Sequence, residues 1–340
     1  MKILIIGAGL TGATLAYNHI KNKDKVLIID KRNHIGGNIY TEFINDIHVH
    51  KYGAHIFHTS DKEIWNFINM FGEFNNYRHC VKSKHLNKYY SLPINLHTYN
   101  EFFDITNPTE ITKNHTDIII NTLFKNYTAK QWNINITEIN PDILKRLSIR
   151  NNYNNNYFDD IYEGIPIKGY TDLINNMLIG SSIILNKELS KDFDYSKYDI
   201  VYNTGCIDKF MNYCLGDLKY RSLLFETIEV PINIYQGCSV INEADSHIKY
   251  TRTIEHKHFC KSKNTKTTII TREYPISYNK TNEPYYCIND KNSNNLYNEY
   301  INIVKQKYPN MIFCGRLGSY KYYDMDDAIK EALKLFNKYK

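Results

Sequence analysis

The chain lacks the short motifs that mark several common classes of enzyme. Its 340 residues contain no C-x-x-C pair, no G-x-S-x-G elbow and no G-x-x-x-x-G-K-[ST] loop. These absences exclude zinc or dithiol motifs of that type, serine hydrolases and P-loop nucleotidases. No apolar run approaches the roughly 20 residues that a membrane-spanning helix needs, and no signal-peptide core follows Lys2. We therefore expect a cytoplasmic protein that does not associate with a membrane.

A strong charge of one sign is also absent. The sequence has 42 Lys and Arg against 36 Asp and Glu, a net charge of +6, and the basic residues are scattered. This distribution argues against nucleic acid as a partner but suits an anionic small molecule. His48, His50, His55 and His58 have no companion cluster of cysteines or carboxylates, so we predict that the protein binds no metal.

The first thirty residues have the pattern of a dinucleotide-binding unit. A short apolar run precedes Gly7, Gly9 and Gly12, which are spaced as G-x-G-x-x-G, and a second apolar run ends at Asp30. A strand, a glycine turn and a helix let backbone amides receive a pyrophosphate, while the acidic residue accepts hydrogen bonds from a ribose diol. Asp30 disfavours NADP because its charge repels a 2′-phosphate, which leaves NAD and FAD.

Two further patterns favour FAD. The double glycine Gly36-Gly37 follows Asp30 closely, as in flavoproteins of the glutathione-reductase and amine-oxidase types. Near the C-terminus, Arg316 is expected to bind the FAD diphosphate, and a helix that opens at Asp324 directs its N-terminal partial charge at the flavin ring. The predicted FAD-binding residues in these patterns are Gly7, Gly9, Leu10, Thr11, Gly12, Asp30, Lys31, Gly37, Asn38, Arg316, Asp324 and Met325.

The rest of the chain predicts an α/β fold around a discontinuous Rossmann-like domain. Residues 99–150 have helical periodicity and no glycine, whereas 225–234 and 267–272 carry the β-branched and aromatic residues typical of antiparallel strands. We expect an FAD-binding domain from residues 1–75, 190–215 and 310–340, a helical insertion from 98–150 with a mobile lid, and an antiparallel β-sheet domain for the substrate from 76–97, 151–189 and 216–309.

Five further segments occur in order along the chain: residues 52–59 (YGAHIFHT), 91–95 (SLPIN), 127–132 (YTAKQW), 251–255 (TRTIE) and 320–326 (YKYYDMD). Together with the flavin pattern they resemble the UDP-galactopyranose mutases of the bacterial type. The resemblance implies an isomerase that interconverts UDP-galactopyranose and UDP-galactofuranose for glycan biosynthesis. It also implies a covalent adduct between the anomeric carbon and reduced FAD, NAD(P)H as external reductant, and a homodimer formed through the helical insertion.

The same resemblance implies roles for individual residues. Arg146 and Arg252 match catalytic arginines that hold the UDP diphosphate while it leaves the sugar and returns. His55 matches a histidine near the flavin ring and is included among both the catalytic residues and the cofactor contacts, and Ile56 next to it is included among the cofactor contacts. The implied substrate-binding residues are Asn95, Phe124, Tyr127, Thr128, Trp132, Arg146, Tyr157, Arg221, Asn242, Arg252, Glu273, Tyr286, Tyr322 and Asp324.

Several departures and alternatives accompany the resemblance. Asn126 and Asn133 stand where the bacterial pattern often has glycine, which bears on the lid, and Cys287 stands where a proline would end the tyrosine segment. An FAD-dependent oxidoreductase of the amine-oxidase type shares the glycine fingerprint. An escort protein of the Rab GDP-dissociation-inhibitor type shares the fold without using flavin. The same mutase chemistry on another UDP-sugar is the third alternative.

Overall fold

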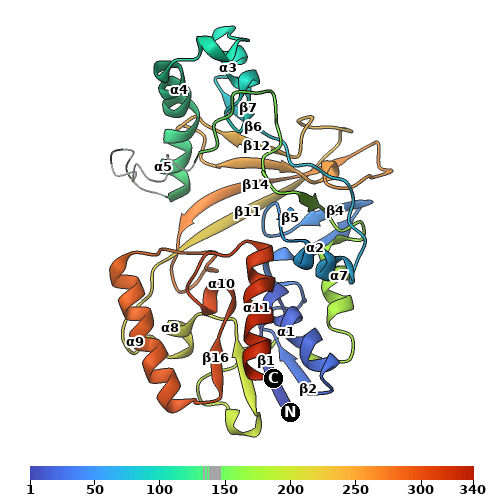
Figure 1. The fold of residues 1–340 in the computed structure, drawn as a ribbon, viewed down its shortest axis with the longest axis vertical. Coiled ribbons are helices and arrows are strands. Elements are labelled where there is room, and N and C mark those ends of the chain that lie inside the picture. The colour runs from blue at the N-terminus through green and yellow to red at the C-terminus, as the bar shows by residue number, and fades with distance from the viewer. Residues whose placement is uncertain (133–134, 136, 138–146) are drawn as a thin grey trace.

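The computed structural model describes residues 1–132, 135, 137 and 147–340, and its lower half in Figure 1 is built on a parallel sheet. The order in this five-stranded sheet is β16-β10-β1-β2-β9. Its strands are β1 Lys2–Ile6, β2 Lys25–Ile29, β9 Ser182–Ile184, β10 Ile200–Asn203 and β16 Met311–Phe313. Strand β1 pairs in parallel with both β10 and β2, so the first strand of the chain lies at the centre of the sheet.

Helices cover both faces of this sheet, as the continuous apolar runs require. Along β1, Ile3 and Ile5 point into one core and Leu4 into the other, and all three are fully buried. The first core packs against α1 Leu10–Lys21, α2 Lys62–Asn69, α7 Gly169–Met177 and α11 Met325–Tyr339; the second packs against α8 Ile207–Phe210 and α9 Lys291–Lys307. The two ends of the chain therefore meet, because α1 and α11 pack side by side (Figure 1).

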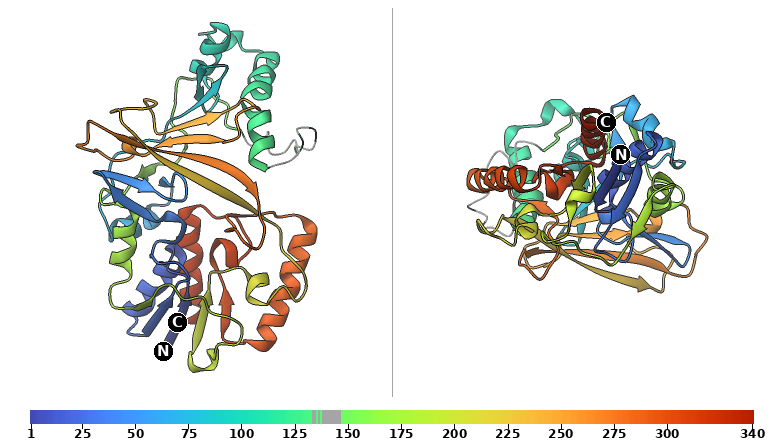
Figure 2. Two further views of the ribbon diagram at one scale, coloured as in Figure 1. Left: turned by 180° about the vertical axis from the view of Figure 1, so that it is seen from behind. Right: turned by 90° about the horizontal axis from the view of Figure 1, so that it is seen from below.

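A seven-stranded sheet crosses between the parallel-sheet domain and the helical insertion (Figure 2). Its order is β15-β11-β14-β13-β12-β6-β7, and only β12 and β6 run in parallel. The strands are β6 Val81–His85, β7 Lys88–Leu92, β11 Tyr220–Val230, β12 Val240–Glu243, β13 Arg252–Glu255, β14 Thr268–Ser277 and β15 Tyr286–Cys287. Two small sheets pair β3 Thr41–Ile44 with β4 Ile47–His50, and β5 Phe57–Thr59 with β8 Tyr162–Gly164.

The helical insertion stands on one edge of this sheet. It contains α3 Leu96–Phe103, α4 Lys113–Ile119, a π-helical turn Ile120–Lys125 and α5 Asn126–Trp132. Ile119 and Leu123 are buried against the sheet in a cluster with Val81 and Val240. Helix α4, the π-helical turn and α5 follow one another without a break. The packing of Ile119 and Leu123 against the sheet therefore also determines where α5 lies.

Two parts of the predicted domain division differ from the structure. Residues 151–189 are assigned above to the antiparallel domain, but β9 pairs with β2 and α7 packs on the parallel sheet. Helix α9, within the predicted 216–309 segment, buries Tyr300 and Val304 against the second face of the parallel sheet. Strand β9 has only three residues and α9 is mainly polar. Tertiary packing, and not the local sequence, therefore decides which sheet each of them joins. Residues Gly315–Gly318 form the short helix α10. None of the helices of the described residues has the length and apolar composition for crossing a membrane.

A buried carboxylate at the end of β13 predicts acid sensitivity. Glu255 is fully buried and accepts hydrogen bonds from the backbone N–H groups of Tyr235 and Gln236, both at 2.8 Å, and from Thr268 Oγ1. Burial alone would raise its pKa, but these bonds and one from His258 lower the pKa of Glu255 from 4.5 to about 2. Since the unfolded chain binds this proton more tightly, the ionised carboxylate stabilises the fold at neutral pH by about 3 kcal/mol.

We therefore expect Glu255→Gln to lower the free energy of unfolding at pH 7 by about 3 kcal/mol. The wild type should lose this advantage as the pH falls from about 5 towards 2, and the variant should show a shallower pH dependence there. Urea unfolding across this pH range measures both. Glu229→Gln on the exposed part of β11 is the matched control, and equal pH slopes for the two variants would contradict the assignment.

Candidate active site

A cavity of about 740 Å³ opens at the carboxyl ends of β1, β2 and β10. It is lined by nearly all the residues predicted for the dinucleotide: Gly7, Gly9, Leu10, Thr11, Gly12, Asp30, Lys31, Gly37, Asn38, His55, Arg316, Asp324 and Met325. The exception is Ile56, which does not line the cavity and instead packs in the core under the helical insertion. The position next to His55 points the other way, which corrects that prediction.

The three glycines of the fingerprint are needed for different reasons. A Cβ on Gly12 would lie 2.0 Å from the carbonyl oxygen of Gly7, so helix α1 approaches β1 too closely for a side chain. Gly7 has a φ of +111°, and a Cβ there would meet Thr204 Oγ1 at 1.9 Å. Gly9 has a φ of −83°, and a Cβ there would make only ordinary contact, 3.6 Å from the Gly37 Cα. Neither the fold nor the backbone of Gly9 demands glycine, whereas a pyrophosphate passing over it would.

Asp30 holds the glycine loop against the second strand. One carboxylate oxygen accepts from the backbone N–H of Ala8 at 2.7 Å and the other from that of Arg32 at 2.8 Å. Gly36 donates its N–H to the Ala8 carbonyl at 2.8 Å. The acidic residue and the double glycine therefore form one unit with the loop, and Asp30 still lines the cavity.

The opposite wall of the cavity comes from the C-terminal segment. Arg316 donates to the carbonyl of Tyr323 through Nε at 3.2 Å and Nη2 at 2.6 Å, which holds its guanidinium beside the cavity. Asp324 is the N-cap of α11, and its side chain makes no capping hydrogen bond. The N-terminal end of the helix dipole therefore lies where Asp324 and Met325 line the cavity, and Oδ1 of Asp326 in the first turn accepts from the Asp327 backbone N–H at 2.8 Å.

A row of polar side chains crosses the antiparallel sheet above the cavity. Asn242 on β12 is the register partner of Arg252 on β13, which is the partner of Glu273 on β14. Side chains at paired positions share one face of a sheet, so these three residues lie side by side although 31 positions separate Asn242 from Glu273. Strand register therefore brings together three residues that lie far apart in the sequence.

Arg252 and Glu273 form a two-bond ion pair. Arg252 Nε and Nη2 donate to the two oxygens of Glu273, each at 2.9 Å, and the Glu273 side chain is 2% exposed against 23% for Arg252. Burial opposes the charge of Arg252, but Glu273 outweighs it and raises the pKa of the guanidinium. One terminal nitrogen, Nη1, is free of this pair, so the carboxylate orients the arginine without using all its donors.

Arg221 is a buried cation with unused hydrogen-bonding capacity. It is 8% exposed, its Nη2 donates to the carbonyl of Gln131 at 3.3 Å, and its Nε finds no partner among the described residues. It pairs in register with Tyr286 on β15. Burial lowers the pKa of the Arg221 guanidinium. A buried donor of this kind is costly unless a ligand accepts from it, and an anion would.

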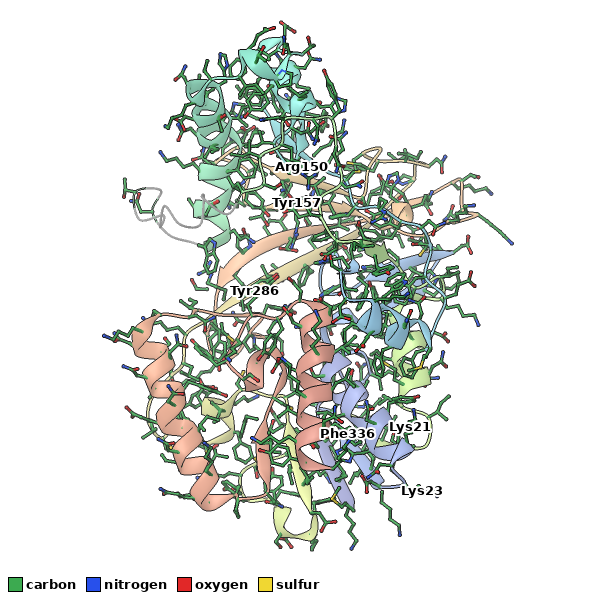
Figure 3. All side chains as sticks on the ribbon, viewed as in Figure 1. Lys21, Lys23, Arg150, Tyr157, Tyr286 and Phe336 are labelled. Atoms are coloured by element: carbon green, nitrogen blue, oxygen red, sulfur yellow. The ribbon has the colours of Figure 1, made fainter. Side chains whose placement is uncertain are left out.

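Tyrosines surround the two arginines. Tyr286 and Tyr322 stack at 6.0 Å with Arg316 over the Tyr322 ring. Burial, with the charge of Glu273, raises the pKa of Tyr286 and of Tyr127 on α5, so both are neutral hydroxyl donors. In Figure 3, Tyr286 lies between the parallel-sheet domain and the antiparallel sheet, while Tyr157 and Arg150 lie towards the helical insertion. As neutral hydroxyl donors, Tyr127 and Tyr286 suit an anionic substrate.

His55 joins the cavity to the tyrosine cluster. Its Nδ1 donates to the Gly53 carbonyl at 2.9 Å, and its backbone N–H donates to His50 Nδ1 at 3.2 Å. Burial, followed by the charge of Arg316, lowers the pKa of His55 to about 4. The imidazole is therefore neutral at pH 7, with Nε2 as its unprotonated nitrogen.

The remaining predicted residues fall into three groups. Phe124, Tyr127, Thr128 and Trp132 lie on the π-helical turn and α5. Asn95 is fully buried as the N-cap of α3, where it accepts from the His97 and Thr98 backbone and donates to Asn154 and Asn155. This capping role uses all its amide donors and corrects the prediction of a substrate contact. Arg146 and Asn133 lie outside the described residues.

Sequence reasoning missed several residues that line the cavity, among them Arg32 and Glu283. Arg32 lines the cavity, stacks over Tyr52 at 4.4 Å and donates to Asn38 Oδ1. Glu283 lines the cavity from a distant loop and binds Lys31 Nζ through both oxygens at 2.7 Å. Arg32 follows Asp30 closely enough to have been included, but the sequence has no signal for Glu283. Within the described residues, no three His, Cys, Asp or Glu side chains gather as metal ligands.

Comparisons with protein families give two matches. Residues 122–322 match a family model described as UDP-galactopyranose mutase, and residues 5–71 match an NAD(P)-binding Rossmann-like domain. The first match contains the arginine and tyrosine cluster, and the second contains the glycine fingerprint.

Curated relatives span nearly the whole chain. A dTDP-fucopyranose mutase of Escherichia coli is 38% identical, covering 98% of this chain and 97% of its own. A probable UDP-galactopyranose mutase of Klebsiella pneumoniae is 36% identical over 98% and 93% of the two chains. Among solved structures, a reduced UDP-galactopyranose mutase matches with a TM-score of 0.75 at 12% identity, over 99% and 94% of the chains. A putative protoporphyrinogen oxidase from Exiguobacterium matches with a TM-score of 0.65 at 11% identity, covering 99% of this chain and 98% of its own. This match reflects the shared fold.

Proposed function

The chain belongs to the UDP-galactopyranose mutase family, and from this premise we propose that it interconverts UDP-galactopyranose and UDP-galactofuranose with reduced FAD as cofactor. The observation that carries the proposal is the position of two arginines, the buried Arg221 and the partly exposed Arg252, among neutral tyrosines beside the dinucleotide cavity. An oxidoreductase of the same fold has no need for a diphosphate holder at that place. A mutase needs one, because UDP must leave the sugar, stay bound and return.

The residues of this cavity fit FAD. A pyrophosphate would pass over Gly9, Asp30 would hold the ribose, and the Arg316 guanidinium supplies positive charge in the same cavity. When bound in its reduced state, FAD supplies an electron-rich ring nitrogen as the nucleophile for the anomeric carbon.

The protein's own residues handle the nucleotide. Arg252 is held by Glu273, so its remaining N–H groups are already oriented when the diphosphate gains charge on leaving. Arg221 gains an acceptor for its unused Nε. The hydroxyl groups of Tyr286 and Tyr322 donate to the phosphate oxygens. His55 is neutral at pH 7 and therefore adds no positive charge beside the cofactor cavity. The departing UDP is therefore retained for the return attack.

The proposal predicts that conversion depends on reduction. Purified protein incubated with UDP-galactofuranose should form UDP-galactopyranose with dithionite and none without it, as followed by chromatography. The furanose is the informative starting point because it is the less stable form. Oxygen consumption with amines and no sugar conversion would instead favour the oxidoreductase. A colourless protein that binds no FAD would favour the escort type.

The 38% identity to a dTDP-fucopyranose mutase favours a second candidate substrate of the same reaction class. Discrimination between UDP-galactose and dTDP-fucose depends on a few contacts to the base and to the sugar, each worth about 1–3 kcal/mol. Parallel assays with UDP-galactofuranose and dTDP-fucofuranose compare the two values of kcat/KM. A ratio above about tenfold towards dTDP-fucofuranose would replace the first substrate while leaving the mechanism in place.

We also propose NAD(P)H as the physiological reductant, the cytoplasm as the compartment and a homodimer as the working state. Seven free cysteines suit a reducing compartment. Leu86 and Tyr89 on the β6–β7 hairpin and Ile118 on α4 are exposed apolar side chains beside the helical insertion, which supports a protein contact there. Light scattering of the purified protein tests the dimer.

A further inference from the structure

Lys130 on α5 is bound by main-chain carbonyls of one turn rather than by a carboxylate. Its Nζ lies 2.7 Å from the carbonyl oxygen of Glu243, 2.9 Å from that of Asp245, 3.1 Å from that of Ile248 and 3.3 Å from that of Tyr250. An ammonium has three protons, so four carbonyls share them. This arrangement is the one by which carbonyl dipoles coordinate a monovalent cation.

The carboxylate of the same turn is used elsewhere. Asp245 accepts from His85 Nδ1 at 2.5 Å and from the Leu86 backbone N–H at 3.1 Å, which ties the turn to the β6–β7 hairpin. Burial lowers the pKa of Lys130 to about 8, while the charges of Glu243 and Asp245 oppose that shift. The ammonium therefore sits inside the turn as its organising cation, and its removal leaves four carbonyls pointing at one another.

The turn and α5 each lead to a residue of the proposed nucleotide-sugar site. Tyr127 precedes Lys130 by three positions and so lies on the same face of α5. Arg252 follows Tyr250, whose carbonyl is the last of the four acceptors, by two positions. Helix α5, which carries Tyr127, packs against β14, and β14 carries Glu273, the ion-pair partner of Arg252. The contact at Lys130 thus sets the spacing between Tyr127 and Arg252.

We infer that Lys130 is a positioning residue for the nucleotide sugar: its ammonium occupies a carbonyl-lined cation site in the 243–250 turn and fixes Tyr127 against Arg252. The inference rests on the proposed function for the identity of the ligand. The cation site itself does not depend on the proposed function. A second tie, from Arg221 Nη2 to the Gln131 carbonyl, holds α5 to β11 independently, so we expect the protein to fold without Lys130.

Two variants separate the positioning role from general stability. Lys130→Met keeps the apolar stem and removes the cation, and it should raise the KM for UDP-galactofuranose and the dissociation constant of UDP about tenfold or more. The FAD content should stay at the wild-type level and kcat should change less than KM. Lys113→Ala is the matched control, because Lys113 lies in the same insertion with an exposed side chain paired to Asp117, and it should change neither value.

Lys130→Ala tests the cation site directly, because it leaves the four carbonyls around an open space. Its melting temperature and UDP affinity should recover in potassium or ammonium chloride but not in tetramethylammonium chloride of equal ionic strength. The wild type and Lys113→Ala should show no such dependence. Wild-type UDP affinity in a folded, FAD-loaded Lys130→Met protein would overturn the positioning role, and equal melting temperatures of Lys130→Ala in all three salts would overturn the cation site. Failure of the wild type to bind UDP would instead count against the proposed function.

Discussion

Arg252→Ala is expected to lower kcat for the mutase reaction by two to three orders of magnitude while the protein keeps its FAD. Glu273 orients the Arg252 guanidinium by accepting from Nε and Nη2 at 2.9 Å, and the Arg252 side chain remains 23% exposed, so it is partly accessible. The removal of one donor aimed at developing charge costs about 10²–10³ in rate. Steady-state assays with dithionite-reduced enzyme and absorbance of bound FAD measure both quantities.

The alanine variant also leaves Glu273 buried without its partner, which costs about 3–5 kcal/mol of stability. A lower rate could then reflect a damaged fold. The double variant Arg252→Ala with Glu273→Gln removes the unpaired carboxylate, so it should recover thermal stability without recovering turnover. Recovery of turnover together with stability would contradict the assigned role of Arg252, and so would an unchanged rate in the single variant.

The local part of the site was predictable from the sequence because it is encoded by neighbours. Gly7, Gly9 and Gly12 follow one strand directly, and Asp30 ends the next, so their meeting depends only on a strand, helix and strand in succession. Arg316 and the start of α11 follow the same logic at the other end of the chain. These short-range patterns determine which atoms line the cavity.

The antiparallel half of the site was not predictable from the residues alone. The row of Asn242, Arg252 and Glu273 exists because of strand register, and a shift by one residue would turn each side chain to the other face. The resemblance to a family supplied their roles. It also predicted that Asn95 binds the substrate and Ile56 the cofactor, whereas in the fold Asn95 caps helix α3 and the Ile56 side chain packs in a core. A motif identifies residues that occur together and does not separate those that bind from those that support.

Gly9→Ala is expected to give a folded protein that binds FAD much more weakly than the wild type, the largest effect on the cofactor. The backbone of Gly9 is extended, with φ −83° and ψ −173°, and its added Cβ would lie 3.6 Å from the Gly37 Cα, an ordinary contact. A Gly-to-Ala change in a permitted conformation stabilises a fold by about 0.4–1 kcal/mol through the unfolded chain. The apoprotein should therefore melt at or slightly above the wild-type apoprotein temperature.

The same methyl group would occupy the space over the loop that the pyrophosphate needs, and overpacking of a fixed site by a backbone-anchored group costs about 1–3 kcal/mol or more. We expect FAD affinity, measured by flavin fluorescence quenching, to fall by two orders of magnitude or more. Gly12→Ala is the contrasting control: its Cβ would lie 2.0 Å from the Gly7 carbonyl oxygen, so it should destabilise the apoprotein itself. A Gly9→Ala protein that binds FAD as tightly as the wild type would mean that the cofactor does not cross this loop, because packing alone gives no reason for glycine at that position.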